Sequence, residues 1–185
     1  MPRLSGSAWP FILRDDRDRI IGLRGPDDHE IYFLSEYYGA WRSTQDQAVS
    51  LVNTATPVTF NVSDYEADVA LSGGDTITFA TGGVWEFAGN FQLSNDTGTI
   101  FAVTFWPRVN GVDAPNTARV LDVPKQHAGG HGHAVLAASY FFTVSAGDQL
   151  QIMWSSPDVG VILETKAADV GPAVPSVFMT VRRVS

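Results

Sequence analysis

The stretch Ala134–Ser156, AVLAASYFFTVSAGDQLQIMWSS, is the part of the sequence that indicates the fold most clearly. A long apolar run, Ala134–Val144, ends at the turn-forming residues SAGD, and Gln149–Ser156 then alternates polar and apolar side chains. Alternation with a period of two is typical of a β-strand that buries one face. The stretch therefore predicts two β-strands joined by a short turn.

The same pattern extends over most of the chain. Thr99–Val109 is almost entirely β-branched or apolar, so we expect a central strand covered on both faces. Asn110-Gly111 is a strong hairpin signal, and Thr117–Val123 is the expected return strand. Short strands separated by turns, without a convincing amphipathic helix, predict an all-β fold. We expect an antiparallel jelly-roll β-sandwich over residues 39–185.

The first 38 residues differ from this head domain and are predicted to form a separate arm. Two apolar runs flank the turn-forming residues Gly25–Asp28, which predicts a short β-hairpin. A two-stranded hairpin is marginally stable by itself, so we expect the arm to pack on a partner. The residues expected to anchor it are Ile20, Ile21, Leu23, Ile31, Tyr32 and Phe33.

Composition excludes several classes of function. The 185-residue chain has a net charge of −8 and no basic cluster, which is unsuited to nucleic-acid binding. It has no cysteine, so disulfides and thiolate metal sites are excluded. No apolar run approaches the ~20 residues of a transmembrane helix, so we expect no membrane insertion. Neither a nucleophile elbow nor a phosphate-binding loop is present, and we expect a non-enzymatic protein without a cofactor.

Three of the four histidines, His127, His131 and His133, lie in the glycine-rich stretch Pro124–Val135. The spacing of His131 and His133 matches the His-x-His of cupin metal sites. Those sites need an acidic ligand shortly afterwards and a later histidine, and the sequence after His133 supplies neither. An exposed loop is therefore the favoured interpretation. The alternatives are an ion site on a threefold axis, formed by His131 and His133 of three copies, and contact with a receptor or substrate.

Asp64, Glu66 and Asp68 form a second candidate cluster. Residues at i, i+2 and i+4 share one face of a strand, and several carboxylates on one face suit Ca²⁺. The alternative is a solvated strand edge, which the lack of a calcium-loop glycine pattern favours.

Several segments of the head resemble bacteriophage fibre, knob and capsid-decoration proteins with a C1q/TNF-like jelly-roll head. The resemblance covers about residues 39–185 and depends on several segments together. These segments are GAWRSTQDQAVSLVNTATPVTFN (Gly39–Asn61), TFWPRVNGVDAPNTARV (Thr104–Val120), FTVSAGDQLQIMWSS (Phe142–Ser156), VILE (Val161–Glu164) and PAVPSVFMTVRRV (Pro172–Val184).

The resemblance implies a homotrimer in which one face of each sandwich packs around a threefold axis. It also implies a virion location on the capsid or tail surface, with the arm bound to a major capsid protein or to a tail or neck protein. Binding of a host-surface glycan or receptor by the head is the alternative function. The aromatic residues of the head then belong either to an interface or to the core: Trp85, Trp106, Tyr140, Phe141, Phe142 and Trp154.

Overall fold

The computed structural model describes residues 11–14, 20–24, 30–32 and 37–185, and all regular structure in these ranges is β-strand. The chain divides into two compact units, Met1–Glu36 and Tyr37–Ser185. Tyr37 and Tyr38, which the sequence analysis assigns to the arm, thus belong to the second unit.

The first unit is a three-stranded antiparallel sheet of β1 (Phe11–Arg14), β2 (Ile20–Arg24) and β3 (Glu30–Tyr32), in that order. Strands β2 and β3 form the predicted hairpin, with Gly22 opposite Tyr32. The sequence analysis did not predict β1, which pairs with the other edge of β2. A third strand is physically favourable because a hairpin alone leaves both of its edges unpaired.

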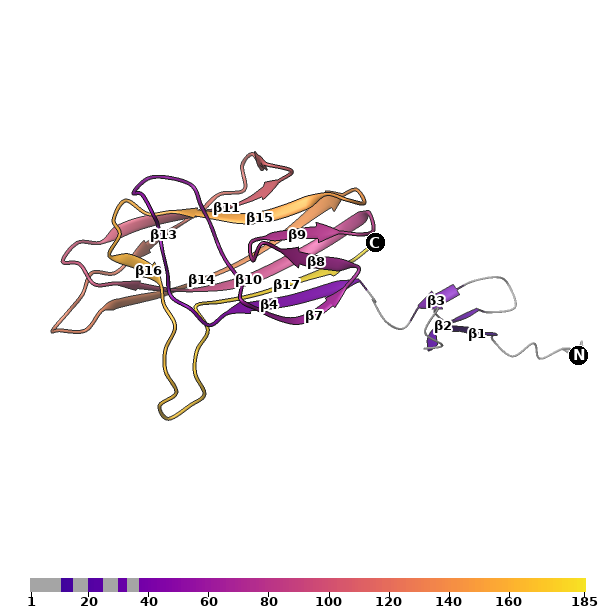
Figure 1. Cartoon of the computed structure of the whole chain (residues 1–185), viewed down its shortest axis with the longest axis horizontal. Coiled ribbons are helices and arrows are strands. Elements are labelled where there is room, and N and C mark those ends of the chain that lie inside the picture. The colour runs from indigo at the N-terminus through magenta and orange to yellow at the C-terminus, as the bar shows by residue number, and fades with distance from the viewer. Residues whose placement is uncertain (1–10, 15–19, 25–29, 33–36) are drawn as a thin grey trace, which may run out of the picture. The chain divides into compact units, whose positions relative to one another are not determined.

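The second unit is a sandwich of two antiparallel sheets that lie face to face (Figure 1). Sheet I has the order β5-β16-β10-β17-β4-β7, with β14 on the other edge of β10. Its strands are β4 (Tyr38–Ser43), β5 (Gln47–Ala48), β7 (Val62–Ala67), β10 (Gly83–Asn95), β14 (Gly132–Val144), β16 (Val161–Leu163) and β17 (Val177–Arg183). The predicted β-sandwich is confirmed.

Sheet II has the order β12-β11-β15-β9-β8, with β13 also paired to β11 and β6 to β15. The Asn-Gly turn joins β11 to the two-residue strand β12, and both turn residues have positive φ angles, 50° at Asn110 and 78° at Gly111. The expected return strand, Thr117–Val123, contains β13, which pairs with β11 farther from the turn, at Phe101–Phe105. The strands are β6 (Thr56–Pro57), β8 (Val69–Ser72), β9 (Thr76–Phe79), β11 (Phe101–Val109), β12 (Val112–Asp113), β13 (Arg119–Val123) and β15 (Gln149–Ser155).

Aromatic side chains from the two sheets meet in the core. Phe91 of β10 lies with its ring centroid 4.7 Å from that of Phe105 on β11, and Phe105 stacks on Trp154 of β15 at 5.8 Å. These rings are almost completely buried, as are Trp41 and Phe87 from sheet I. Such contacts stabilise the fold by more than the burial of apolar area alone, because aromatic rings at these separations attract one another.

The expectation of a doubly covered strand at Thr99–Val109 needs correction. Strand β11 is central, because β13 and β15 flank it, but its burial alternates: Val103 and Phe105 are buried and Trp106 only partly. A two-layer sandwich covers one face of each sheet, so a nearly continuous apolar run does not make a doubly covered strand. Strand β14 is likewise one-sided. Its Tyr140 is buried, whereas Phe141 is 64% exposed.

Gly39 illustrates how tightly the core is packed. A Cβ atom at Gly39 would lie 2.1 Å from Cη2 of Trp41, the buried indole two residues along β4. It would also lie 2.7 Å from Cγ2 of Val69 on β8. The absence of a side chain at position 39 therefore allows the Trp41 indole to lie against the strand that carries it.

We expect Gly39→Ala to reduce the free energy of unfolding by about 2–3 kcal/mol, because the added methyl group overlaps the indole of Trp41. Equilibrium unfolding in urea, followed by tryptophan fluorescence, measures the change. Gly98→Ala is the matched control, since a Cβ at Gly98 meets nothing within 4 Å. Equal stability of the two variants would contradict the packing argument.

Candidate functional site

The solvent-facing side of sheet I is the first candidate site, and we call it the outer face. Strand alternation and register place its side chains in cross-strand rows, such as Phe141, Glu86, Arg182 and Tyr38 across β14, β10, β17 and β4. The residues of the outer face are Tyr38, Ala40, Arg42, Tyr65, Glu86, Ala88, Asn90, Gln92, Val135, Ala137, Ser139, Phe141, Phe178, Thr180 and Arg182.

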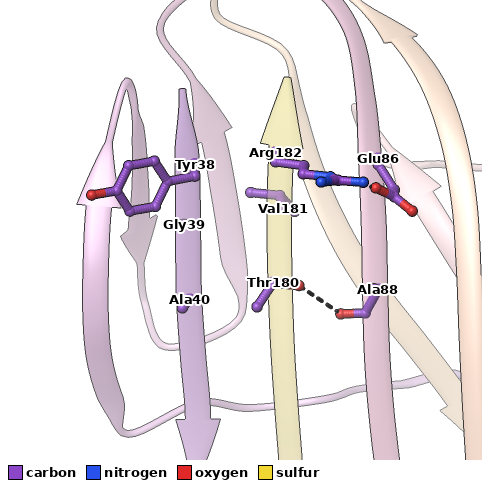
Figure 2. A pocket seen from close by; sticks show the side chains of 8 residues that line it. All are labelled: Tyr38, Gly39, Ala40, Glu86, Ala88, Thr180, Val181 and Arg182. Atoms are coloured by element: carbon purple, nitrogen blue, oxygen red, sulfur yellow. Dashed lines mark hydrogen bonds and ion pairs between the residues drawn. The ribbon is translucent and has the colours of Figure 1, made fainter. Parts of the chain in front are cut away.

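Small side chains in the middle of this face create a hollow. Figure 2 shows Ala40, Ala88 and Thr180 along its floor, with the ring of Tyr38 to one side. The hollow has a volume of about 270 Å³. On its other side Arg182 Nε donates to Glu86 Oε2 at 2.5 Å. A neighbouring hollow of about 280 Å³ lies between β10 and β14, again over short side chains.

Large apolar side chains surround these hollows. Phe141 and Tyr65 are 64% and 63% exposed, and Tyr38 and Phe178 are 40% and 39% exposed. The rings of Tyr38 and Tyr65 lie 6.1 Å apart, centroid to centroid. Several large apolar side chains exposed on one face of a sheet are typical of an interaction site, although the Glu86–Arg182 ion pair lies among them. Of the six aromatic residues that the sequence singled out, only Phe141 belongs to this face and is strongly exposed; Trp85, Tyr140 and Trp154 belong to the core.

The histidine-rich stretch forms the loop before β14, and glycine shapes it. His127 and Gly130 exchange backbone hydrogen bonds around a tight turn whose middle residues, Ala128 and Gly129, have φ angles of 50° and 83°. A Cβ at Gly132 would lie 1.8 Å from the carbonyl oxygen of Pro124, so only glycine fits there. The loop therefore has a defined backbone conformation that positions His131 and His133.

These two histidines flank one carboxylate. His131 Nδ1 lies 3.4 Å from Oε1 of Glu164, and His133 Nδ1 lies 3.3 Å from Oε2. His131 Nδ1 also lies 3.0 Å from the Ser94 hydroxyl, and Lys166 Nζ lies 3.2 Å from His133 Nε2. Both imidazoles are nearly half exposed, whereas the Glu164 side chain is only 17% exposed.

The sequence analysis missed Glu164 as the acidic partner of the histidines. It considered only the residues directly after His133, whereas Glu164 follows β16, which pairs with β10 beside His133. Within the described part of the chain, no group of three or more His, Cys, Asp or Glu side chains is arranged to hold a metal ion. The ion site formed by three copies of His131 and His133 stays a prediction.

The three carboxylates Asp64, Glu66 and Asp68 do not converge, so the calcium-site alternative fails. A bulge in the pairing of β7 with β4 falls at Asp64, which forms an ion pair with Arg42 at 2.8 Å. Asp68 occupies the corner between β7 and β8, with a φ angle of 60°, and accepts a hydrogen bond from the Thr81 hydroxyl. The bulge and the corner break the regular alternation that a shared face requires.

Glu66 instead connects strands β4, β7 and β8 through a single carboxylate oxygen. Its Oε1 accepts hydrogen bonds from Trp41 Nε1 at 2.7 Å, from the Ser63 hydroxyl at 2.9 Å and from the Leu71 amide at 3.1 Å. Burial opposes ionisation of this group, but the three hydrogen bonds outweigh it and hold the pKa of Glu66 below its ordinary value of 4.5.

Of the residues expected to anchor the arm, Ile20, Ile21 and Leu23 lie on β2, and Ile31 and Tyr32 lie on β3. Phe33 lies outside the described residues. The anchoring role of all six stays a prediction.

No protein-family model matches the chain, and no curated protein is significantly similar to it. In the described ranges there is no apolar helix of a length that would cross a membrane.

We expect Glu66→Gln to reduce the free energy of unfolding at pH 7 by about 0.5–1 kcal/mol, because a neutral amide accepts weaker hydrogen bonds at this exposed position. A carboxylate with a lowered pKa stabilises the fold above its unfolded pKa and loses this effect as the pH falls through its folded pKa. The difference between the wild type and the variant should therefore shrink below about pH 4.5. Urea unfolding between pH 3 and pH 7 measures it. A difference independent of pH would contradict this role, and Asp122→Asn on β13 is the control.

Proposed function

We propose that this protein is a non-enzymatic structural component of a bacteriophage virion. In this proposal the sandwich is the head of a homotrimeric knob or decoration protein, and residues 1–38 attach it to the capsid or tail. The proposal combines the β-sandwich fold with the sequence resemblance of residues 39–185 to phage head domains. The observation that supports it most directly is the apolar outer face of sheet I.

The outer face is suited to a second copy of this chain because it offers both protruding rings and hollows. Phe141 is exposed on β14, and farther along the same strand the short side chains of Ala88 and Ala137 leave space for an incoming group. The hollow between Tyr38 and Ala88 is large enough to receive an aromatic ring. A contact of a ring on one copy with a hollow on the next is heterologous, and such contacts close into rings when the rotation allows.

Strand β14 adds a second reason for self-association. Among the described strands it pairs with β10 alone, so its other edge offers unpaired backbone groups over much of its length. Long open edges favour association with another chain. An assembly that covers both the outer face and this edge would shield apolar surface from water and pair the free backbone N–H and C=O groups of β14.

A glycan- or receptor-binding head is the second candidate function. A groove of about 610 Å³, within the size range of small-molecule sites, lies beside Arg42, Thr44 and Phe178. An aromatic surface beside cationic and hydroxyl groups suits a saccharide. The two functions are compatible, because the groove and the hollows of the outer face are lined by different residues. Binding to a glycan array tests the second function separately, and a blank array would count against it.

We expect a solution mass of three 20.0 kDa chains, measured by light scattering during gel filtration. Phe141→Ser should shift the mass towards one chain, because it removes a phenyl ring that is 64% exposed on the outer face. Val112→Ser is the matched control, since Val112 is 70% exposed but belongs to sheet II. A wild-type mass of one chain would refute the trimer, and a trimer that survives Phe141→Ser would refute this interface.

We expect deletion of residues 1–36 to abolish attachment to the virion while the head stays folded. The deletion keeps Tyr37, whose ring packs edge-on against Trp85 at 6.4 Å. Binding of the full and shortened chains to particles that lack the protein can be measured by co-sedimentation, and circular dichroism checks the fold of the head. Retained attachment would refute the anchoring role of the arm. Cryo-electron microscopy of the particle would show whether the protein is attached to the capsid or to the tail.

A further inference from the structure

The groove of about 610 Å³ is lined both by the outer face of sheet I and by the loop between β16 and β17. Arg42 and Phe178 line it from β4 and β17, and Lys166 and Val174 line it from the base of the loop. The loop projects away from sheet I (Figure 1), and backbone hydrogen bonds of 3.0 and 2.9 Å between Lys166 and Val174 close its base. The groove therefore has hydrogen-bonded secondary structure on both sides.

The charged side chains that line the groove are both cations, Arg42 and Lys166, although the chain as a whole has a net charge of −8. Two carboxylates lie nearby, but neither belongs to the lining. Asp64 accepts hydrogen bonds from Arg42, and Asp46 accepts them from Thr165. A cleft lined by charges of one sign attracts a ligand of the opposite sign, so the groove is suited to an anionic group.

Arg42 keeps much of its hydrogen-bonding capacity for such a group. Its Nη1 lies 2.8 and 3.1 Å from the two carboxylate oxygens of Asp64. Its Nε and Nη2 have no hydrogen-bond partner among the described residues. A guanidinium group presents its N–H donors in a fixed plane that matches the oxygens of a carboxylate or a phosphate. The ion pair with Asp64 thus holds the guanidinium in place, while Nε and Nη2 stay available to a ligand.

Phe178 adds an apolar surface beside this cation. The register of β17 with β4 places Phe178 directly opposite Arg42, so the two side chains are neighbours on the outer face. The Phe178 side chain is 39% exposed. An aromatic ring provides a large apolar contact area, on which the C–H face of a sugar ring can pack. An inorganic anion has no apolar face for Phe178, and the ring therefore favours a saccharide that carries the anionic group.

Two threonine hydroxyls complete the lining and differ in what they offer. Thr44 Oγ1 accepts a hydrogen bond from Asn61 Nδ2 at 2.9 Å, so its own hydrogen is free to donate. Thr165 Oγ1 donates to Asp46 Oδ1 at 2.7 Å, so its oxygen is free to accept. A saccharide hydroxyl both donates and accepts. The groove can therefore satisfy sugar hydroxyls in both directions.

We propose that the groove binds an acidic saccharide, whose carboxylate or phosphate group pairs with Arg42 and Lys166 and whose sugar ring packs on Phe178. This inference rests on the second candidate function, glycan binding, and names the class of ligand. Thr44 and Thr165 form hydrogen bonds with the sugar hydroxyls. All of these contacts come from one chain, so they do not depend on the proposed trimer.

A glycan array that carries saccharides with uronic acids, saccharides with phosphate groups and uncharged saccharides tests the ligand class. Binding confined to acidic members would support the proposal, and the members bound would identify the anionic group. Equal binding to uncharged members would overturn the inference but leave the glycan-binding function intact. A blank array would count against both.

Titration calorimetry with the acidic saccharide that binds best on the array, and with its carboxyl-reduced or dephosphorylated counterpart, tests the residues. Lys166→Gln should weaken binding of the acidic form roughly 5–20-fold, because it removes one exposed charge-assisted contact, and should leave binding of the neutral form unchanged. Lys125→Gln is the matched control, because it makes the same change at an exposed lysine outside the groove, and it should keep the wild-type affinity.

Phe178→Leu should weaken binding of both forms to a similar extent, because packing on the ring does not depend on the charge of the saccharide. Circular dichroism checks that each variant is folded. Equal loss of affinity for the two forms in Lys166→Gln would show that the lysine shapes the groove without contacting the anionic group, and would overturn the proposal. Unchanged affinity of Lys166→Gln for the acidic form would overturn it as well.

Discussion

Strand β10 holds sheet I together because both of its edges are paired. Along one edge it is hydrogen-bonded to β14 from Gly83 to Asn95, and along the other edge to β17 and then to β16. Its inward side chains, Phe87 and Phe91 among them, fill the core against sheet II. A long strand with two paired edges cannot shift its register without moving every neighbour, since a slip of one residue exchanges the two faces.

The candidate sites depend on this strand. Its outward residues Glu86 and Ala88 form part of the hollow on the outer face, and Ser94 lies opposite His133 near the end of the strand. Pairing with β16 at Leu93–Asn95 brings the following residue, Glu164, to the histidines. One set of ladder hydrogen bonds thus places both the apolar face and the His–Glu–Lys network on the same side of sheet I.

The outer face and the network differ in what they can do. The face offers apolar surface and hollows, which suit a lasting contact with another chain. The network brings two imidazoles to one mostly buried carboxylate and Lys166 to His133, beside the groove that Lys166 lines. The two features occupy different parts of sheet I. The loop between β16 and β17, which begins near Lys166, projects from the sheet (Figure 1), whereas the hollows lie over β4, β10, β14 and β17.

The sequence by itself determined that the fold is all-β, and it located the turn at Asn110-Gly111 and the β2–β3 hairpin. It also determined which side of β15 is buried. These features follow from local alternation and turn chemistry. The tertiary structure decided what each strand faces. Whether Phe141 is core or surface depends on β14 lying in a two-layer sandwich, and Asp64, Glu66 and Asp68 diverge because a bulge and a corner interrupt the strand. Glu164 meets His131 and His133 only through pairing between distant segments. Local periodicity contains no information on such pairing, because it is set by which sheet edges meet when the core closes.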